Sequence, residues 1–335
     1  MSAVKKVIED LPKALKTFSG RLPEMPELKK KAAELPSTLA TLSDVLPKNV
    51  FGQFPENEYR PEGIKLRAVL TADWHTDADP LRDRTDILRR GLCGIAATSR
   101  VDAVVLAGDI TNAGHVKEYK LLKRLFTVYA NAQKAIPQFG NHDCRGTSIY
   151  PYYHEAEQLF EDFCRFCGRD VHAPYYLTTV NGYYFIVMGT DKLMHNTMYV
   201  SPEQLEWLDR TLALASTSGK PIFVVNHQSP DTRNGIPEKW AVEGGIGEQS
   251  EAVEAILAKH SAKNKILFIS GHLHRLDDKS FEKANDNLYF LNLPSFEYND
   301  GTGFIMDVYD DRIELLCRSF ITGIYTPDHH RTIGL

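Results

Sequence analysis

Residues 65–75, KLRAVLTADWH, decide how this chain folds. They begin as a β-type, mostly apolar run and end in Asp73, Trp74 and His75. A short apolar run bounded by polar residues predicts a buried strand. Residues 101–109, VDAVVLAGD, and residues 135–143, AIPQFGNHD, repeat this arrangement. We therefore expect buried strands whose carboxyl ends carry polar side chains.

Helical segments are predicted between these strands. They cover residues 84–99 and 115–130, and alternation of strands and helices at this spacing predicts βαβ units and a largely parallel or mixed sheet. A later helix is expected to begin at Ser201, with Pro202 in its first position. Buried strands are expected within 221–228 and 265–275, with a helix between them.

The closing part of the chain predicts three further strands, over residues 288–296, 303–310 and 311–320. Apolar and polar residues alternate more strongly here than in the earlier strands, so we expect these strands to be antiparallel. The fold class indicated by the whole pattern is a layered α/β domain.

Composition is that of an ordinary globular protein. The chain has 335 residues, of which 43% are hydrophobic and 25% are charged. A net charge of −5 gives no electrostatic case for nucleic-acid binding, so no nucleic-acid partner is expected. Five irregularly spaced cysteines do not form a secreted disulfide framework. The start of the chain lacks the apolar segment of a signal peptide, and we expect a cytoplasmic protein.

Three regions are expected along the chain: a helical N-terminal extension over 1–60, the main domain over 61–325, and a fraying tail over 326–335. Apolar residues recur at helical spacing near the start, from Val4 to Leu15, with lysines between them. This extension is interpreted either as an arm packed on the main domain or as a helix that binds a partner or a membrane surface. Oligomeric state is not indicated by the sequence.

Five short motifs follow predicted strands, and their side chains suit metal binding. Loops at the carboxyl ends of strands in an open α/β sheet converge on one place, so motifs scattered over the sequence can meet. Carboxylate, imidazole and amide oxygen groups are ligands for divalent metals. Seven such side chains are too many for one ion and suit two ions a few ångströms apart. The motifs are Asp73-Trp74-His75, Gly108-Asp109, Gly140-Asn141-His142-Asp143, Asn226-His227 and Gly271-His272-Leu273-His274.

The order and spacing of these motifs resemble the calcineurin-like metallophosphoesterases. The pieces are DWH, GDITN, GNHD, NH and GHLH, and the resemblance covers residues from about 65 to 320. Each piece is weak alone, whereas GNHD followed by GHLH, with D-x-H and GD upstream, is strong. The resemblance implies an α/β/β/α sandwich with mixed sheets and a catalytic domain over 61–325. It also implies hydrolysis of phosphoesters with two metal ions, which would be Mn, Fe or Zn.

Roles for individual residues follow from the resemblance, position by position. Asp73, His75 and His274 match the ligands of a first metal. Asp109 matches the carboxylate that bridges the two metals. The second metal is expected to be bound by Asn141, His227 and His272.

Two residues of the GNHD motif match catalytic positions that are not metal ligands. His142 should contact the phosphate and protonate the leaving oxygen, and Asp143 should orient neighbouring groups. Two cations lower the pKa of a bridging water, and the resulting hydroxide is expected to attack the phosphorus in line.

Within the family, the chain is most similar to the class III cyclic-nucleotide phosphodiesterase branch. The segment GDITNAG, the helix with Glu118 and Tyr119, and Arg145 two residues after GNHD carry this likeness. We therefore expect a small phosphodiester as substrate, with a phosphomonoesterase, such as a protein or nucleotide phosphatase, as the alternative. A non-catalytic scaffold is a third interpretation.

Two further residues are candidates for substrate binding, each with an alternative. Arg145 suits a phosphate but equally suits a surface salt bridge. Trp74 could stack on a substrate base or pack beside the metals. The chain also departs from the branch, which often has two adjacent histidines where this sequence has Asn226-His227.

Overall fold

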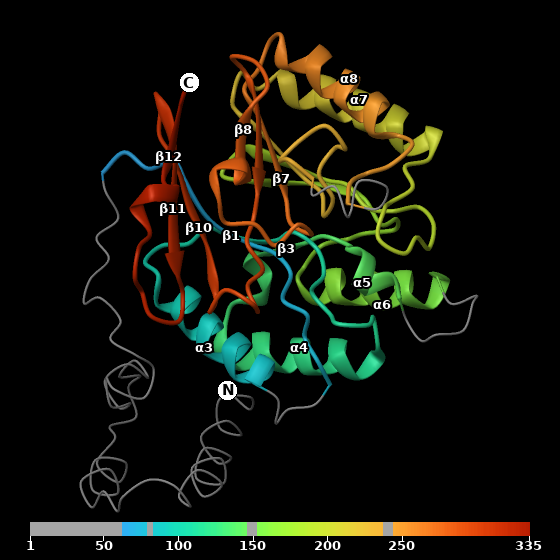
Figure 1. Cartoon of the computed structure of the whole chain (residues 1–335), viewed down its shortest axis with the longest axis vertical. Coiled ribbons are helices and arrows are strands. Elements are labelled where there is room, and N and C mark those ends of the chain that lie inside the picture. The colour runs from blue at the N-terminus through green and yellow to red at the C-terminus, as the bar shows by residue number, and fades with distance from the viewer. Residues whose placement is uncertain (1–61, 79–82, 146–152, 237–243) are drawn as a thin grey trace, which may run out of the picture. The chain divides into compact units, whose positions relative to one another are not determined.

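A computed structural model describes residues 62–78, 83–145, 153–236 and 244–335 (Figure 1). The predicted helical extension over 1–60 lies outside the described residues. The described residues form two mixed β-sheets and the helices that cover them.

The first sheet has the strand order β12-β11-β10-β1-β2-β3. Strands β1, β2 and β3 run parallel, as their buried apolar sequences predict, whereas β10, β11 and β12 are antiparallel. The strands are β1 (Leu66–Thr71), β2 (Ala103–Leu106), β3 (Ala135–Pro137), β10 (Thr302–Val308), β11 (Arg312–Ser319) and β12 (Arg331–Gly334).

The second sheet has the order β4-β5-β6-β7-β9-β8. Its four inner strands are parallel and its two edge strands are antiparallel to their neighbours. The strands are β4 (Tyr176–Val180), β5 (Tyr183–Val187), β6 (Ile222–Val225), β7 (Ile266–Ser270), β8 (Phe281–Lys283) and β9 (Leu288–Asn292).

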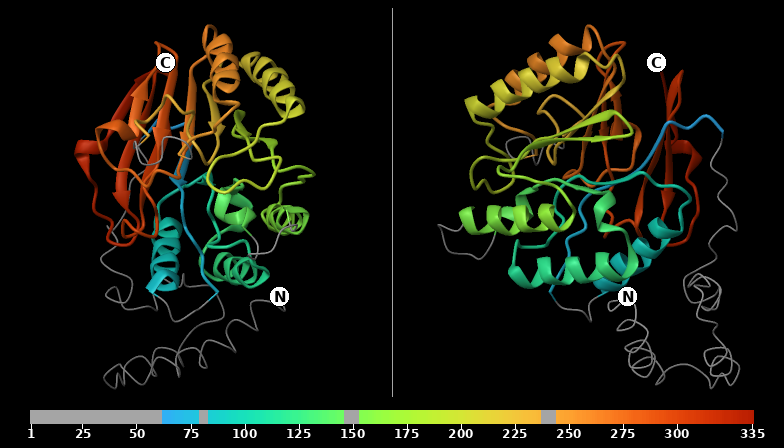
Figure 2. Two further views of the ribbon diagram at one scale, coloured as in Figure 1. Left: turned by 45° about the vertical axis from the view of Figure 1, so that its right-hand side comes forward. Right: turned by 180° about the vertical axis from the view of Figure 1, so that it is seen from behind.

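Helices cover the outer faces of the two sheets (Figure 2). Helix α7 begins where the sequence predicts, because the Ser201 hydroxyl accepts a hydrogen bond from the backbone N–H of Gln204 at 3.1 Å and Pro202 occupies the first turn. Helices α7 (Pro202–Ser216) and α8 (Ser250–Ser261) lie on one side of the molecule. The other side carries α3 (Asp83–Ala97), α4 (Val116–Tyr129) and α6 (Tyr153–Phe166), and the short α5 (Asn141–Cys144) follows β3.

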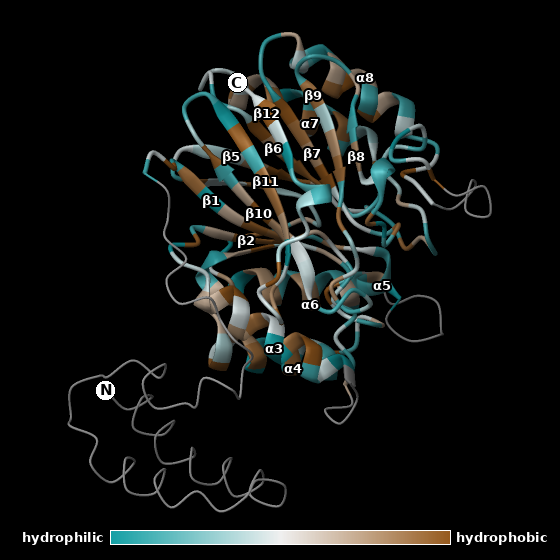
Figure 3. Cartoon of the chain, turned by 60° about the vertical axis from the view of Figure 1, so that its left-hand side comes forward, coloured by the Kyte–Doolittle hydropathy of each residue, from teal (hydrophilic) through white to brown (hydrophobic). Residues whose placement is uncertain are grey.

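Two hydrophobic cores lie between these layers. Neighbouring residues of β5 and β6 alternate between them: Phe185 and Phe223 belong to the larger core, while Ile186 and Val224 pack with α7 and α8. The period of two follows from the pleat of the strand. Both sheets are accordingly coloured mostly hydrophobic in Figure 3. The layered α/β/β/α fold class implied by the sequence is confirmed.

Of two predictions about the end of the chain, one holds in part and one was wrong. The sequence indicated an antiparallel strand at β9, which is antiparallel to the edge strand β8 but parallel to β7. All five of its residues are buried, so its neighbours and not its polarity pattern set its direction. The tail does not fray at its end, because Arg331–Gly334 pairs with β11 as β12, and Ile333 is buried in the larger core. None of the helices in the described ranges has the length and apolar character needed to cross a bilayer.

Candidate metal centre

The candidate ligands come from both sheets. Asp73 and Asp109 follow β1 and β2 of the first sheet, while His227 and His272 follow β6 and β7 of the second. Each loop leaves the carboxyl end of a parallel strand, where polar side chains of α/β folds gather. The two carboxylates and the histidines form three groups whose potential ligand atoms lie within 4.8 Å of one another. These groups are Asp73, His75 and His274; His75, Asp109 and His142; and Asp109, His227 and His272.

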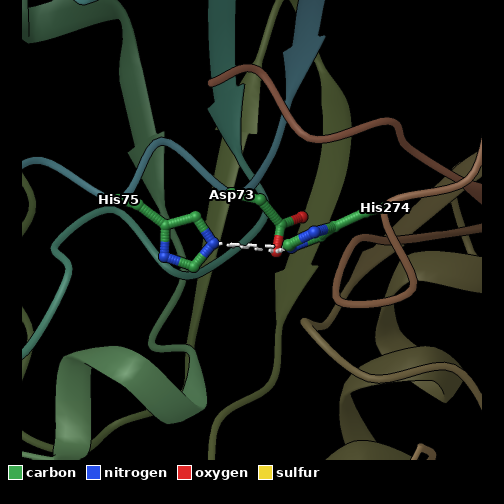
Figure 4. A group of neighbouring side chains, drawn as sticks. All are labelled: Asp73, His75 and His274. Carbon is green, nitrogen blue, oxygen red and sulfur yellow. Dashed lines mark hydrogen bonds and ion pairs between the residues drawn. The ribbon is translucent and has the colours of Figure 1, made fainter. Parts of the chain in front are cut away.

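The first group is shown in Figure 4. His274 Nε2 lies 2.9 Å from a carboxylate oxygen of Asp73 and 3.4 Å from His75 Nε2. Asp73 is fully buried, and the two rings point their Nε2 atoms toward it. Because a neutral imidazole needs a donor or a cation opposite its unprotonated nitrogen, this convergence suits a bound cation.

The third group, Asp109, His227 and His272, centres on His227, which has no exposed surface. Its Nδ1 lies 2.9 Å from the carbonyl oxygen of Ala107, so Nδ1 carries the proton of the neutral ring. Its Nε2 then presents a lone pair to an Asp109 carboxylate oxygen 3.0 Å away. Two acceptors at this distance require a proton or a cation between them. The ring of His272 lies 5.1 Å from that of His227, measured between centroids.

Asn141 carries an orphaned acceptor and directly follows Gly140, which packs against Asp109. Its amide nitrogen donates to the carbonyl oxygen of His195 at 3.1 Å. That contact fixes the side chain so that Oδ1 is the remaining polar atom, and it is buried without a hydrogen-bond partner among the described residues. Such an unpaired oxygen costs about 1–3 kcal/mol unless a ligand satisfies it. The donor set therefore fits metal ions.

Electrostatics in this cluster favour charged carboxylates. Burial opposes ionisation of Asp109, but His227, His142 and His75 outweigh burial and hold the pKa of Asp109 well below its usual range. Burial likewise lowers the pKa of His75, to about 4. Burial also lowers the pKa of His227, but the Asp109 and Asp73 carboxylates outweigh burial and raise this pKa to about 9. In the metal-free protein, a proton on His227 therefore occupies the place where a cation would bind.

Asp109 belongs to both the second and the third group. One of its oxygens accepts a hydrogen bond from the backbone N–H of His142 at 2.8 Å, while the other faces His227. The glycines beside it allow this close packing, since a Cβ on Gly108 would collide with His227 and one on Gly140 would collide with Asp109 itself. Asp109 is thus shared by two of the three groups, and its two oxygens have different partners.

His142 is oriented by the loop after β2. Its Nδ1 lies 2.6 Å from the carbonyl oxygen of Asn112 and 3.3 Å from an Arg145 nitrogen. The guanidinium only donates and the carbonyl only accepts, so the shorter contact decides that Nδ1 carries the proton. Nε2 is then free to exchange a proton, and it lies 3.9 Å from Asp109. Burial lowers the pKa of His142, although Asp109 opposes this.

Asp143 is a fully buried carboxylate that joins two loops. One oxygen accepts from the backbone N–H and hydroxyl of Thr111 at 2.8 and 2.6 Å. The other accepts from the N–H groups of Gly140 and Ile110 at 2.9 and 3.3 Å. Burial and the charge of Asp109 raise the pKa of Asp143 to about 7. Its position supports the predicted orienting role, because these donors belong to the loops that carry Asp109 and His142.

The two candidate substrate residues differ in position. Trp74 is fully buried, with its ring stacked between Phe126 at 5.7 Å and Phe296 at 4.9 Å. It has no surface to offer a substrate, so that prediction was wrong and the packing alternative holds. Arg145 stays beside His142 and donates to Asn196 Oδ1 at 2.9 Å, so it is tied to the 191–200 loop.

The sequence patterns did not identify two residues that lie at the site, Tyr298 and Arg84. Tyr298, in the loop after β9, lies with its ring 5.3 Å from His274 and 6.0 Å from His75. Arg84 of α3 pairs with Glu297 and donates to Asn112 Oδ1 at 2.9 Å. The position of Tyr298 after a strand was the available signal, but no motif marks it.

Comparison with known proteins agrees with this geometry. The profile of the family described as calcineurin-like phosphoesterase matches residues 66–276. A Rhodococcus erythropolis protein named "Probable cyclic nucleotide phosphodiesterase" is 30% identical over 197 residues, which are 57% of this chain and 58% of that protein. The chain thus matches less than two thirds of that relative's length.

A solved structure shows the same fold. It is described as a dimetal phosphatase from Danio rerio, with 16% identity and a TM-score of 0.51, and the match covers 81% of this chain and 99% of that one. At this identity the likeness concerns the fold alone. The profile match spans more than half of the sequence and includes the loops of all five motifs. This chain belongs to the calcineurin-like phosphoesterase family.

Proposed function

We propose that the chain is a metal-dependent hydrolase of phosphodiesters. The observation that carries the proposal is the convergence of six candidate ligands from both sheets, with His142 beside them; the six are Asp73, His75, Asp109, His227, His272 and His274. The convergence supports an enzyme over a scaffold, since buried orphaned acceptors and facing lone pairs are costly without a ligand.

The proposed metal sites divide the ligands as the motifs suggest. Asp73, His75 and His274 would hold one ion, and the other would be held by Asn141, His227 and His272, with Asp109 shared. Two bound cations would supply a water of lowered pKa and positive charge opposite the phosphoryl oxygens. Mn, Fe and Zn all suit this donor set.

His142 is the proposed proton donor to the leaving oxygen. Its Nδ1 is committed to the Asn112 carbonyl oxygen at 2.6 Å, so the proton that moves is the one on Nε2. Nearly a quarter of its side chain, 23%, is exposed, whereas Asp109 is buried, so His142 lies on the accessible side of the cluster. General acid catalysis of this kind contributes about 10²–10⁴-fold to a rate.

Two observations support a diester over a monoester. The named relative from Rhodococcus erythropolis is described as a cyclic nucleotide phosphodiesterase. In addition, both arginines beside the cluster have protein partners, Arg84 with Glu297 and Arg145 with Asn196. A diester carries less negative charge than a monoester at neutral pH, so it needs fewer additional cations around it.

The test compares an aryl phosphodiester with its monoester on the Mn-loaded protein. Wild type should hydrolyse the diester with the higher kcat/KM. Asp109→Asn is the matched control, since asparagine tolerates the left-handed backbone of Asp109 (φ 49°) and removes only the charge. A higher kcat/KM on the monoester would replace the proposal with a phosphatase. No turnover with Mn, Fe or Zn would favour the scaffold.

A further inference from the structure

Tyr298 is an exposed aromatic ring fixed beside the metal centre. Its exposed fraction is 61%, and it is the aromatic member of the strongly exposed large hydrophobic residues in the described part of the chain. The other members of that set are aliphatic, namely Val116, Val128, Leu214, Ile324 and Leu335. An aromatic ring left in water at an active site contributes little to folding, because most of its apolar area stays hydrated.

The position of the ring is set by contacts with the site. Its backbone N–H donates to the Ser295 hydroxyl at 3.2 Å, and that hydroxyl donates to the carbonyl oxygen of Asp73 at 3.1 Å. The phenol oxygen accepts from Arg84 at 3.4 Å, and the Arg84 guanidinium lies 5.9 Å from the ring centroid. Arg84 is itself held by Glu297 and by Asn112 Oδ1 at 2.9 Å.

These contacts connect the ring to the proposed proton donor. The carbonyl oxygen of Asn112 orients His142, while the side chain of the same residue holds Arg84. The ring thus has a fixed place relative to both His274 and His142 without being buried. A preorganised exposed ring binds a flat ligand with little loss of side-chain entropy.

We propose that Tyr298 stacks on a planar aromatic group of the substrate, so that the preferred phosphodiesters are nucleotides and not glycerol esters. The inference rests on the proposed function and names the substrate class for it. A sugar separates a nucleobase from the phosphorus. The ring of Tyr298 has a comparable separation from the candidate ligands, since its centroid lies 6.0 Å from that of His75 and 5.3 Å from that of His274. Base stacking on aromatic side chains is worth about 1–3 kcal/mol.

The first measurement compares kcat/KM for 3′,5′-cyclic AMP and for glycerophosphoethanolamine. Tyr298→Ala should lower the value for cyclic AMP about tenfold, mainly through KM, and change the value for the glycerol ester less than about twofold. Tyr298→Phe keeps the ring and should stay near wild type. Leu214→Ala, which truncates an exposed residue of α7, is the control for surface truncation. Equal losses on both substrates, or no loss on either, would overturn the inference.

A binding measurement tests the same contact without turnover. Calorimetry on the Mn-loaded protein should show that Tyr298→Ala weakens AMP binding about tenfold and leaves the binding of inorganic phosphate unchanged. Unchanged AMP binding, or an equal loss for AMP and phosphate, would overturn the inference. A wild-type protein that hydrolyses neither diester would instead contradict the proposed function, while AMP binding would still decide the role of Tyr298.

Discussion

Backbone strain is concentrated in the metal centre, and it can be measured. Five candidate ligands have a positive φ, which non-glycine residues rarely adopt: Asp73, His75, Asp109, His272 and His274. We predict that, in the metal-free protein, His274→Gly is more stable than His274→Ala. Both substitutions remove the imidazole, so the difference between them isolates the backbone.

The size of the difference follows from the conformation. His274 has φ 51°, and the left-handed region costs an L-residue about 1–2 kcal/mol relative to glycine. Glycine loses more chain entropy on folding, which offsets this by about 0.5–1 kcal/mol. From the midpoints of these two ranges, the glycine variant should therefore be more stable by about 0.75 kcal/mol, which corresponds to about 1.5–3 °C in Tm for a domain of this size.

Denaturant titration after metal chelation measures the difference directly. The matched control is His227, a candidate ligand that is not among the positive-φ residues. There the order should invert, with His227→Ala more stable than His227→Gly by about 0.5–1 kcal/mol. An alanine variant at 274 that is as stable as the glycine variant would refute the claim of strain. The same order at both positions would refute it as well.

Three more predictions concern the proposed chemistry. His142→Ala should lower kcat about 10²–10⁴-fold on an alkyl phosphodiester but much less on a p-nitrophenyl diester, whose leaving group needs no proton; equal losses would contradict the acid role. Mn²⁺ binding at pH 7 should release about one proton from His227, because its pKa of about 9 keeps it protonated in the metal-free protein. This release should vanish as pH rises through 9, and calorimetry in buffers of different ionisation enthalpy, with His227→Gln as control, measures it. Asp143→Asn should lower the free energy of unfolding by about 2–6 kcal/mol, because the asparagine NH₂ would face the backbone N–H groups of Gly140 and Ile110, which are also donors. Urea denaturation measures the loss, and a value below about 1 kcal/mol would contradict this prediction.

Much of the fold was predictable from local patterns. Strands such as Leu66–Thr71 and Ile266–Ser270 are short apolar runs that end in motif residues, and α7 begins with a capping serine and a proline. The parallel pairing of β9 with β7 was not predictable, because full burial fits either direction: β10 is also fully buried and is antiparallel to both of its neighbours. Strand β12 was missed for a related reason: only Ile333 of its four residues is buried.

The candidate site likewise has features that the sequence predicted and features that it did not. Spacing predicted which residues meet, because the carboxyl ends of the parallel strands β1, β2, β6 and β7 must lie together once the two sheets pack. Spacing did not predict the burial of Trp74, whose partners Phe126 and Phe296 are far away in the sequence. It also did not reveal Tyr298, since a single tyrosine in a loop has no pattern.

The features that make this site suited to metals also make it costly without them. Asp73 and Asp109 are two buried carboxylates, and His227 faces Asp109 across 3.0 Å with a lone pair or a proton between them. Positive φ angles add about 1 kcal/mol or more at each strained ligand. A cation would neutralise the carboxylates, satisfy Asn141 Oδ1 and occupy the place of the His227 proton. Occupancy of the site and stability of the loops around it are therefore thermodynamically linked, because a ligand that binds only the folded state stabilises it.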